Sequence, residues 1–272
     1  MEPGLRLQVV RYRPDPPRWP AAQRLRIAML ADIHAGGRYM PIARVRDIVA
    51  ETNALEPDLV VLLGDYSTSG GLHGPGVTVD DCLDALAGLR APLGVHSVLG
   101  NHDWWDDAQV QRTRSGRPYV QAALAQAGLG PLQNEARRLR TPGGPVWIAG
   151  LGDQLAYPLG NRRFLGTHNL PRTLAPLAAD PAPAILLAHE PDIFPAVPER
   201  VALTLCGHTH GGQVRLLGWS PIVPSRFGNR YAYGHVTERG RDLIVSGGLG
   251  TSVLPLRFGV PPEIVLVELG RG

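Results

Sequence analysis

The feature that most constrains this chain is a set of short apolar segments, each ending in a cluster of polar residues. Several segments are uninterrupted runs of Val, Ile and Leu, as expected for strands buried on both faces. In a sheet rich in parallel strands, the carboxyl ends meet at one edge, where ligands usually bind. We therefore expect the clusters to converge on one pocket. They are ADIH at 31–34, LLGDY at 62–66, LGNHDWW at 99–105, LAHEPD at 187–192 and CGHTHGG at 206–212.

The hydrophobic patterning predicts the order of the elements. The first third reads as alternating strands and helices and predicts a partly parallel sheet, whereas the last third is mostly strand and turn. Helices are expected at 41–55, 79–89 and 118–127, and strands at 5–13, 25–30, 59–63, 94–99, 146–149, 184–187, 202–205, 213–217, 242–245 and 263–268. Irregular stretches are expected at 104–116, 156–172 and 218–234, and such long loops are usually functional or mobile.

Composition limits the class of protein. The chain has 272 residues, of which 44% are apolar and 19% are charged, so it can build a sizeable core and we expect a single domain over 1–272. All 27 basic residues are Arg, against 24 acidic residues, for a net charge of +3. The arginines are scattered, which favours genome composition over selection for phosphate binding as their cause. Without a basic arm, no stable nucleic-acid binding is expected.

The cysteines and the N-terminus bear on the compartment. Cys82 and Cys206 are too few for a disulfide framework. The opening MEPGLRLQVVRYRPDPPRWP lacks the apolar core of an export signal, and no apolar run reaches the ~18 residues of a membrane span. We expect a cytoplasmic protein, with the inner face of the membrane as the alternative location.

The polar clusters hold a plausible set of metal ligands. Asp32 and His34 are two residues apart and would point to the same side of an extended strand, and His208 and His210 share that spacing. A single Asp or His at a strand end is more often a cap, so it is the occurrence of all the clusters together that indicates a metal site. The seven candidates are Asp32, His34, Asp65, Asn101, His189, His208 and His210.

Seven ligands exceed what one ion can use, but two ions that share a bridging carboxylate can use them all. A nitrogen and oxygen set without thiolates favours Mn, Fe, Zn, Co or Ni over Ca. We expect two divalent ions, with Mn, Fe or Zn foremost.

The ordered set DxH, GD, GNHD, H and GHTH, from Asp32 to His210, resembles the calcineurin-like metallophosphoesterase superfamily. The tail GGLGTSVLPLRFGVPPEI extends the likeness almost to the C-terminus, and within the superfamily the chain is similar to the bacterial YaeI/YkuE-type phosphodiesterase branch. The resemblance implies an α/β fold, a four-layer αββα sandwich of two mixed β-sheets flanked by helices, with a dinuclear metal site at the strand ends.

The resemblance also implies residue roles. Asp65 would bridge both metals, and His102 would face the substrate without binding a metal. The first metal would be held by Asp32, His34 and His210, and the second by Asn101, His189 and His208.

These roles suit phosphoester hydrolysis, most simply of a phosphodiester. A hydroxide bridging the two cations would attack phosphorus, and His102 would assist the leaving group. Asp103 would orient His102 or a neighbouring ligand, or else cap the following turn.

The substrate is open to alternatives. A lipid-linked pyrophosphate of the UDP-diacylglucosamine type, reached by peripheral membrane contact, is one, and a non-catalytic scaffold is another. Trp104 and Trp105 are expected at the pocket rim or packing a loop onto the domain, and Arg38, Arg226 and Arg230 are candidates for a second phosphate.

Overall fold

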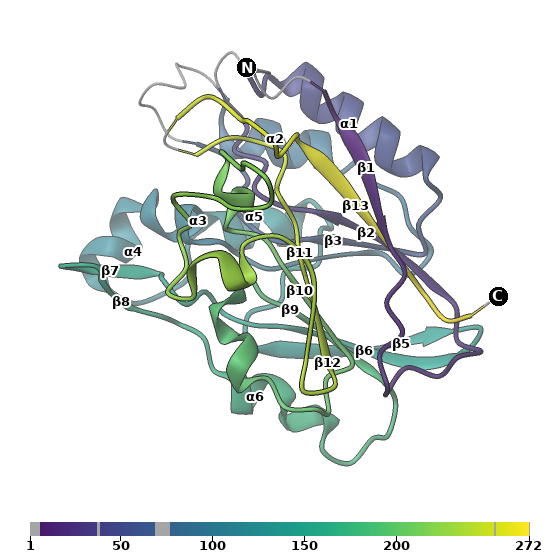
Figure 1. Ribbon diagram of the computed structural model, residues 1–272. Helices are drawn as coiled ribbons and strands as arrows, with labels where there is room; N and C mark the ends of the chain where they lie inside the picture. The colour runs from purple at the N-terminus through teal and green to yellow at the C-terminus, as the bar shows by residue number, and fades with distance from the viewer. Residues whose placement is uncertain (1–5, 37–38, 69–76, 253, 272) are drawn as a thin grey trace.

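A five-stranded mixed sheet forms half of the core in the computed structural model, which describes residues 6–36, 39–68, 77–252 and 254–271. Its strand order is β1-β13-β2-β3-β4, and β2, β3 and β4 run parallel, joined through helices α1 and α2 (Figure 1). The elements are β1 (Gln8–Tyr12), β2 (Leu25–Leu30), α1 (Ile42–Ala54), β3 (Leu59–Leu62), α2 (Val79–Leu86), β4 (Val95–Ser97) and β13 (Glu263–Leu269). The parallel β-α-β-α-β unit expected from the sequence is confirmed.

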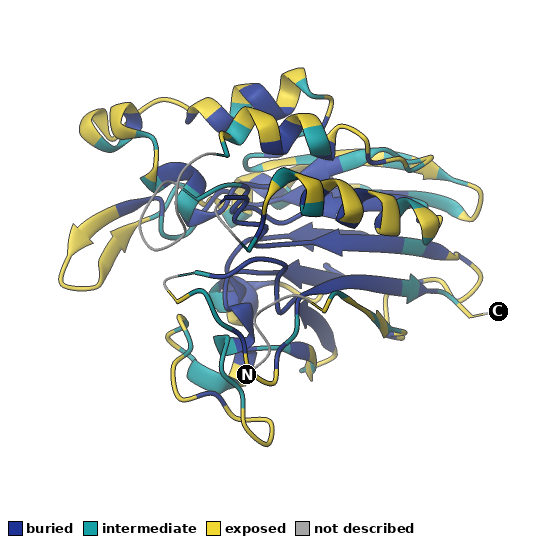
Figure 2. Cartoon of the chain, turned by 90° about the horizontal axis from the view of Figure 1, so that it is seen from above, coloured by how far each residue is buried: buried dark blue, intermediate teal, exposed yellow. Residues whose placement is uncertain are grey.

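A six-stranded mixed sheet forms the other half, in the order β11-β12-β10-β9-β6-β5. The four central strands are parallel and both edge strands are antiparallel to their neighbours. The strands are β5 (Glu135–Thr141), β6 (Gly144–Gly150), β9 (Ala184–Leu187), β10 (Leu203–Cys206), β11 (Gly234–Glu238) and β12 (Arg241–Val245). A separate hairpin, β7 (Tyr157–Gly160) and β8 (Arg163–Leu165), projects from the side of the molecule (Figures 1 and 2).

Side-chain alternation along the strands places one core between the sheets and one more on the outer face of each sheet. On β2, Ile27 and Met29 pack in the same cluster as Leu205 of β10, whereas Ala28 and Leu30 face the other way, toward the helices. Figure 2 shows dark blue strands with helices whose outer faces are yellow. The expected sandwich of two mixed sheets flanked by helices is confirmed.

Helices cover both outer faces. Val45, Ile48 and Val49 form the buried face of α1, which begins after Pro41 as expected. The remaining helices are α3 (Asn101–Trp105), α4 (Ala108–Thr113), α5 (Tyr119–Gln126) and α6 (Leu170–Leu174), with the 3₁₀ turns η2 (Ala175–Leu177), η3 (Pro191–Ala196), η4 (His210–Gly212) and η5 (Gly228–Tyr231). Within the described ranges, no helix has the length and hydropathy to cross a membrane.

Several expected elements differ from the structure. The strand expected at 213–217 is wrong, because this segment forms only isolated bridges from Val214 to Phe258 and from Leu216 to Trp219. The stretches expected to be irregular contain α4 and the β7–β8 hairpin, while β5 and β11 were not expected. Both are edge strands with half-exposed, polar sequences, so they lack the apolar signal of the central strands.

Leu205→Ala should destabilise the fold, because Leu205 is fully buried between the two sheets. We expect the free energy of unfolding to fall by about 2–5 kcal/mol in urea denaturation. Leu165→Ala, at a side chain that is 51% exposed, is the matched control and should change it by less than about 0.5 kcal/mol. Equal effects of the two substitutions would contradict the packing described here.

Candidate metal centre

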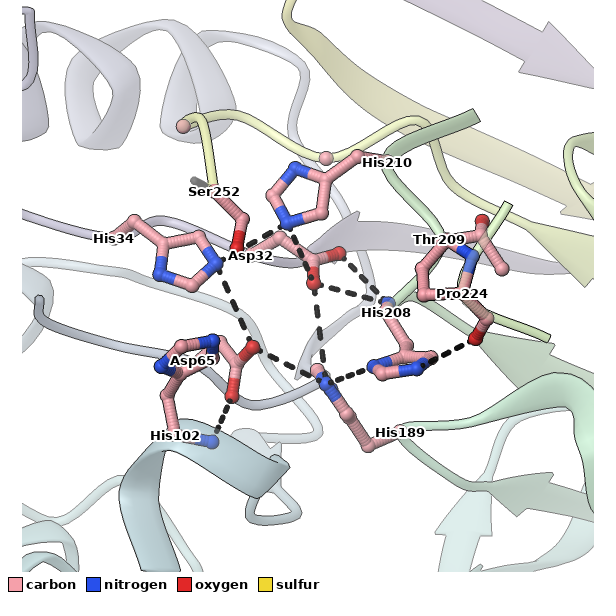
Figure 3. Close-up of polar contacts among 12 residues, drawn as sticks. Asp32, His34, Asp65, His102, His189, His208, Thr209, His210, Pro224 and Ser252 are labelled. Atoms are coloured by element: carbon pink, nitrogen blue, oxygen red, sulfur yellow. Dashed lines mark hydrogen bonds and ion pairs between the residues drawn. The ribbon is translucent and has the colours of Figure 1, made fainter. Parts of the chain in front are cut away.

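The polar clusters meet at one edge of the two sheets, as Figure 3 shows for most of their Asp and His side chains. Each candidate ligand stands just beyond the end of a strand. Asp32 and His34 follow β2, Asp65 follows β3, Asn101 opens α3 after β4, His189 follows β9, and His208 and His210 follow β10. Both sheets therefore contribute to one site, and all seven residues are buried.

The backbone at this edge is bent into conformations that most residues avoid. Five of the seven candidates have φ in the left-handed region: Asp32 (51°), His34 (44°), Asp65 (59°), His208 (68°) and His210 (51°). The extended geometry considered for the two-residue spacings is therefore wrong, and sharp turns aim these side chains instead. Such conformations cost free energy and cluster at functional sites, where the surrounding structure imposes them.

Close packing of the loops requires glycine at position 100. A Cβ atom there would lie 2.3 Å from Oδ1 of Asp65 and 2.6 Å from Cε1 of His189. No side chain fits in that space without displacing both residues. Gly100 thus lets the carboxylate and the imidazole approach each other across the two sheets.

Asp65 lies at the middle of the cluster. Its Oδ2 is 3.5 Å from Nε2 of His34 and 3.3 Å from Nε2 of His189, and its Oδ1 accepts a 2.9 Å hydrogen bond from the backbone N–H of His102. One carboxylate is therefore in contact with imidazoles from opposite sides of the site.

A second carboxylate, Asp32, lies beside the other histidines. Its Oδ1 is 3.6 Å from Nε2 of His210, and both of its oxygens accept the backbone N–H of His208 at 3.0 Å. Donor atoms of Asp32, His34 and His210 all lie within 4.8 Å of one another, which is close enough for a single ion.

Backbone carbonyls orient two of the imidazoles. Nδ1 of His189 is 2.6 Å from the carbonyl of Leu63, and Nε2 of His208 is 2.9 Å from the carbonyl of Pro224. When each of these nitrogens donates to its carbonyl, the other nitrogen of the neutral ring is left with a lone pair. Those two lone-pair nitrogens, 3.3 Å apart, face each other, as metal-binding histidines do.

An unpartnered atom completes the donor set. Within the described part of the chain, Oδ1 of Asn101 is buried without a hydrogen-bond partner. Leaving a buried acceptor unpaired costs about 1–3 kcal/mol, which a cation at this position would offset. Carboxylate, amide and imidazole donors suit divalent transition metals, so the residues present fit such a centre.

The buried charges shift each other's pKa values. Burial raises the pKa of Asp32 to about 7, with a further contribution from Asp65. Burial also opposes ionisation of Asp65, but His189 and His102 outweigh it and hold that pKa well below its usual range. The pKa of His189 is raised well above 6.5 by Asp65, despite burial, while burial drives the pKa of His210 well below 6.5.

His102 and Asp103 sit in the first turn of α3. The His102 ring is partly exposed and lies 5.0 Å from the His34 ring, edge to face. The Asp103 carboxylate instead accepts the backbone N–H groups of Gly100, Asp65 and Tyr66 at 2.8–3.1 Å. Asp103 therefore caps the first turn of α3 and holds the backbone of the Asp65 loop, and it does not cap the turn that follows it.

The residues expected to contact substrate differ in whether the structure leaves them available beside the site. Of the two placements considered for Trp104, packing onto the domain is confirmed and the rim is wrong, because its side chain is 4% exposed and packs against Tyr157 in the core. Trp105, on the other side of the helix, is partly exposed and lies 5.1 Å from the His102 ring. Arg230 forms a bidentate pair with Glu238, and Arg226 contacts Asp192. Arg38 lies outside the described residues.

Two neighbours of the site were not expected. Glu190 has a carboxylate oxygen within 4.8 Å of donor atoms of His189 and His208. The buried Arg257 donates to Nδ1 of His210 at 3.1 Å and to the carbonyls of Gly247 and Gly250. Glu190 could have been suspected from its place beside His189, whereas Arg257 is remote in sequence from every cluster.

Comparison with known proteins assigns the class. The sequence model of the calcineurin-like phosphoesterase family matches residues 25–212, which span every candidate ligand. The chain belongs to the calcineurin-like phosphoesterase family. It is therefore a metallophosphoesterase, a hydrolase of phosphoric esters, in a family that uses divalent metal ions.

Bacterial relatives extend the match. The chain is 30% identical to the uncharacterized metallophosphoesterase YkuE of Bacillus subtilis, over 90% of this chain and 78% of that protein. It is 30% identical to the phosphodiesterase YaeI of Escherichia coli, over 90% and 82%. An uncharacterized metallophosphoesterase of Aquifex aeolicus is 29% identical over 98% and 93%. The expected family and branch resemblance is confirmed.

Metal affinity should rise with pH. The pKa of His189 is raised and that of Asp32 is about 7, and below these pKa values both side chains are protonated. A cation must displace those protons in order to bind the donor atoms. As the pH rises through this range, those protons leave and binding tightens. Calorimetric titration of metal-depleted protein with Mn²⁺ should give roughly ten-fold or greater tightening from about pH 6 to about pH 8, with proton release. An affinity independent of pH would contradict this account.

Proposed function

We propose that this chain is a phosphodiesterase that works with two divalent metal ions. The observation that carries the proposal is the position of Asp65, whose Oδ2 lies within 3.5 Å of imidazoles on both sides of the site. A bridging carboxylate in that position can serve two ions at once. The printed name of the Escherichia coli relative, a phosphodiesterase, supports the same class of substrate.

Each ion would have its own donors. Asp32, His34 and His210 would hold the first ion, and Asn101, His189 and His208 the second, with Asp65 shared. When bound, the two ions would neutralise phosphate charge and lower the pKa of water, which makes a nucleophile available near neutral pH. Mn, Fe and Zn all suit this donor set.

The protein's own contribution is positioning and proton transfer. Asp103 holds the backbone of the Asp65 loop. The backbone carbonyls of Leu63 and Pro224 fix the ring orientations of His189 and His208, respectively. His102 is partly exposed beside these residues, so its imidazole would reach the leaving oxygen of a bound ester and donate a proton to it.

The buried guanidinium of Arg257 has its partners within the protein. Arg257 directs its donors to backbone carbonyls and to His210 rather than toward solvent. It therefore supports His210 and the loop around Gly247 and Gly250.

The test is hydrolysis of bis-p-nitrophenyl phosphate beside p-nitrophenyl phosphate, with Mn²⁺ and with a chelator. We expect faster, metal-dependent turnover of the diester. Asp65→Asn should lose both bound metals and lower the rate by at least roughly 100-fold, because one carboxylate serves both ions. Preference for the monoester would overturn the diester assignment. No turnover of either compound by metal-loaded protein would favour a scaffold or a very selective pocket, such as one for a lipid-linked pyrophosphate.

His102→Ala should separate proton transfer from metal binding. We expect the bound metal per chain to be unchanged and kcat to fall by roughly 10²–10⁴-fold for a diester with an alkoxide leaving group. The loss should be smaller for the weakly basic p-nitrophenolate, which needs less help from an acid. Elemental analysis of the purified variant is the control, and loss of metal from it would refute the assigned role.

A further inference from the structure

An exposed apolar loop follows the last candidate ligand directly. Residues 216–225, LLGWSPIVPS, contain no charged side chain and lie between Arg215 and Arg226. Leu217 is fully exposed, and Trp219 and Ile222 are 58% and 77% exposed. A contiguous group of large apolar side chains in water marks an interaction surface more often than chance exposure does.

A second segment joins this loop in one surface. The backbone N–H of Arg215 donates to the carbonyl of Phe258 at 2.7 Å, and that of Phe258 donates to the carbonyl of Gln213 at 2.8 Å. The Gln213 side chain also donates to the carbonyl of Leu254 at 3.2 Å. We call the exposed set the apolar patch: Leu216, Leu217, Trp219, Ile222, Leu254 and Phe258.

The tip of the patch holds an apolar residue where the backbone disfavours one. Leu216 and Trp219 exchange backbone hydrogen bonds at 2.8 and 2.9 Å, with Leu217 and Gly218 between them at φ of 48° and 82°. Two-residue turns with positive φ at both positions prefer Asn followed by Gly. Leucine here is unfavourable for the backbone and leaves its whole side chain in water, so the fold gains nothing from it.

The charged residues within and directly beside the two segments of the patch are arginines. No Asp or Glu occurs from Arg200 to Thr237, or in 251–262. The partly buried Arg215 guanidinium lies 3.4 Å from the Ser220 hydroxyl and 5.6 Å from the Tyr233 ring, and no described carboxylate lies within ion-pair distance of it. From the flanking elements, Arg226 contacts Asp192 and Arg230 contacts Glu238, but their side chains remain 69% and 58% exposed.

We propose that the apolar patch docks this enzyme on the surface of a lipid bilayer with anionic headgroups. Exposed Leu and Ile can enter the acyl boundary, Trp prefers the interface, and Arg pairs with anionic headgroups. The patch adjoins the metal centre, because Pro224 accepts from His208 and the loop begins after His210. Docking therefore brings the centre to the membrane surface, whatever ester it hydrolyses.

The experiment is flotation of the full chain with vesicles of equimolar phosphatidylglycerol and phosphatidylcholine, beside vesicles of phosphatidylcholine alone. We expect the wild-type chain to float with the anionic vesicles and much less with the neutral ones. Leu217→Asn should reduce the bound fraction roughly ten-fold, because it removes the inserted side chain. It should leave the melting temperature unchanged or higher, because Asn fits the turn. Arg215→Gln should weaken anionic binding several-fold.

Matched control substitutions elsewhere on the surface show whether vesicle binding depends on the apolar patch itself. Leu165→Asn removes an exposed leucine from the β7–β8 hairpin, and Arg140→Gln removes an exposed arginine from β5, and both should leave flotation unchanged. Failure of the wild type to float, or equal flotation of wild type and Leu217→Asn, would overturn the proposal. So would a wild-type dimer in light scattering that Leu217→Asn abolishes without any vesicle binding. Flotation needs no turnover, so this result is independent of the phosphodiesterase assay.

Discussion

The burial of two carboxylates at one point dominates this molecule. Asp32 and Asp65 are both almost completely inaccessible to solvent, and each would be costly to bury as an isolated charge. Four imidazoles and one amide surround them, and the backbone turns sharply at most of those residues. The local features of the site, from the glycine at position 100 to the carbonyls behind the histidines, follow from the need to bring these groups together before any ion binds.

Much of the framework could be predicted from the sequence where apolar patterning is strong. β2 and β9 match their expected bounds: β9 is wholly apolar, and β2 is apolar apart from Arg26, so each stands out from the polar residues that follow it. The edge strand β5, with sequence EARRLRT, gives no such signal because half of it faces solvent. The strand expected at 213–217 failed for the opposite reason, since its apolar residues belong to an exposed turn rather than to a core.

The features of the site also fall into those that could be predicted from the sequence and those that could not. Ligand candidates could be chosen by residue type and spacing, since Asp, His and Asn after apolar runs have few other reasons to gather. Their left-handed backbone could not be inferred, because it depends on contacts between loops remote in sequence. Which of two adjacent tryptophans faces outward depends on the phase of α3, a short helix that the patterning did not reveal. Arg257 was likewise invisible, because only the fold brings it against His210.

The division of the donors between two sheets has a mechanical consequence. One sheet carries four of the donors at the ends of its strands: Asp32, His34, Asp65 and Asn101. The other sheet carries the remaining three, His189, His208 and His210. Any slip of one sheet over the other would change the spacing of the donors as directly as a change at the site itself. The leucines, isoleucines and valines packed between the sheets therefore hold the donor atoms of the two sheets at fixed distances. Substitutions among them, far from any reacting atom, would change those distances and with them the activity of the enzyme.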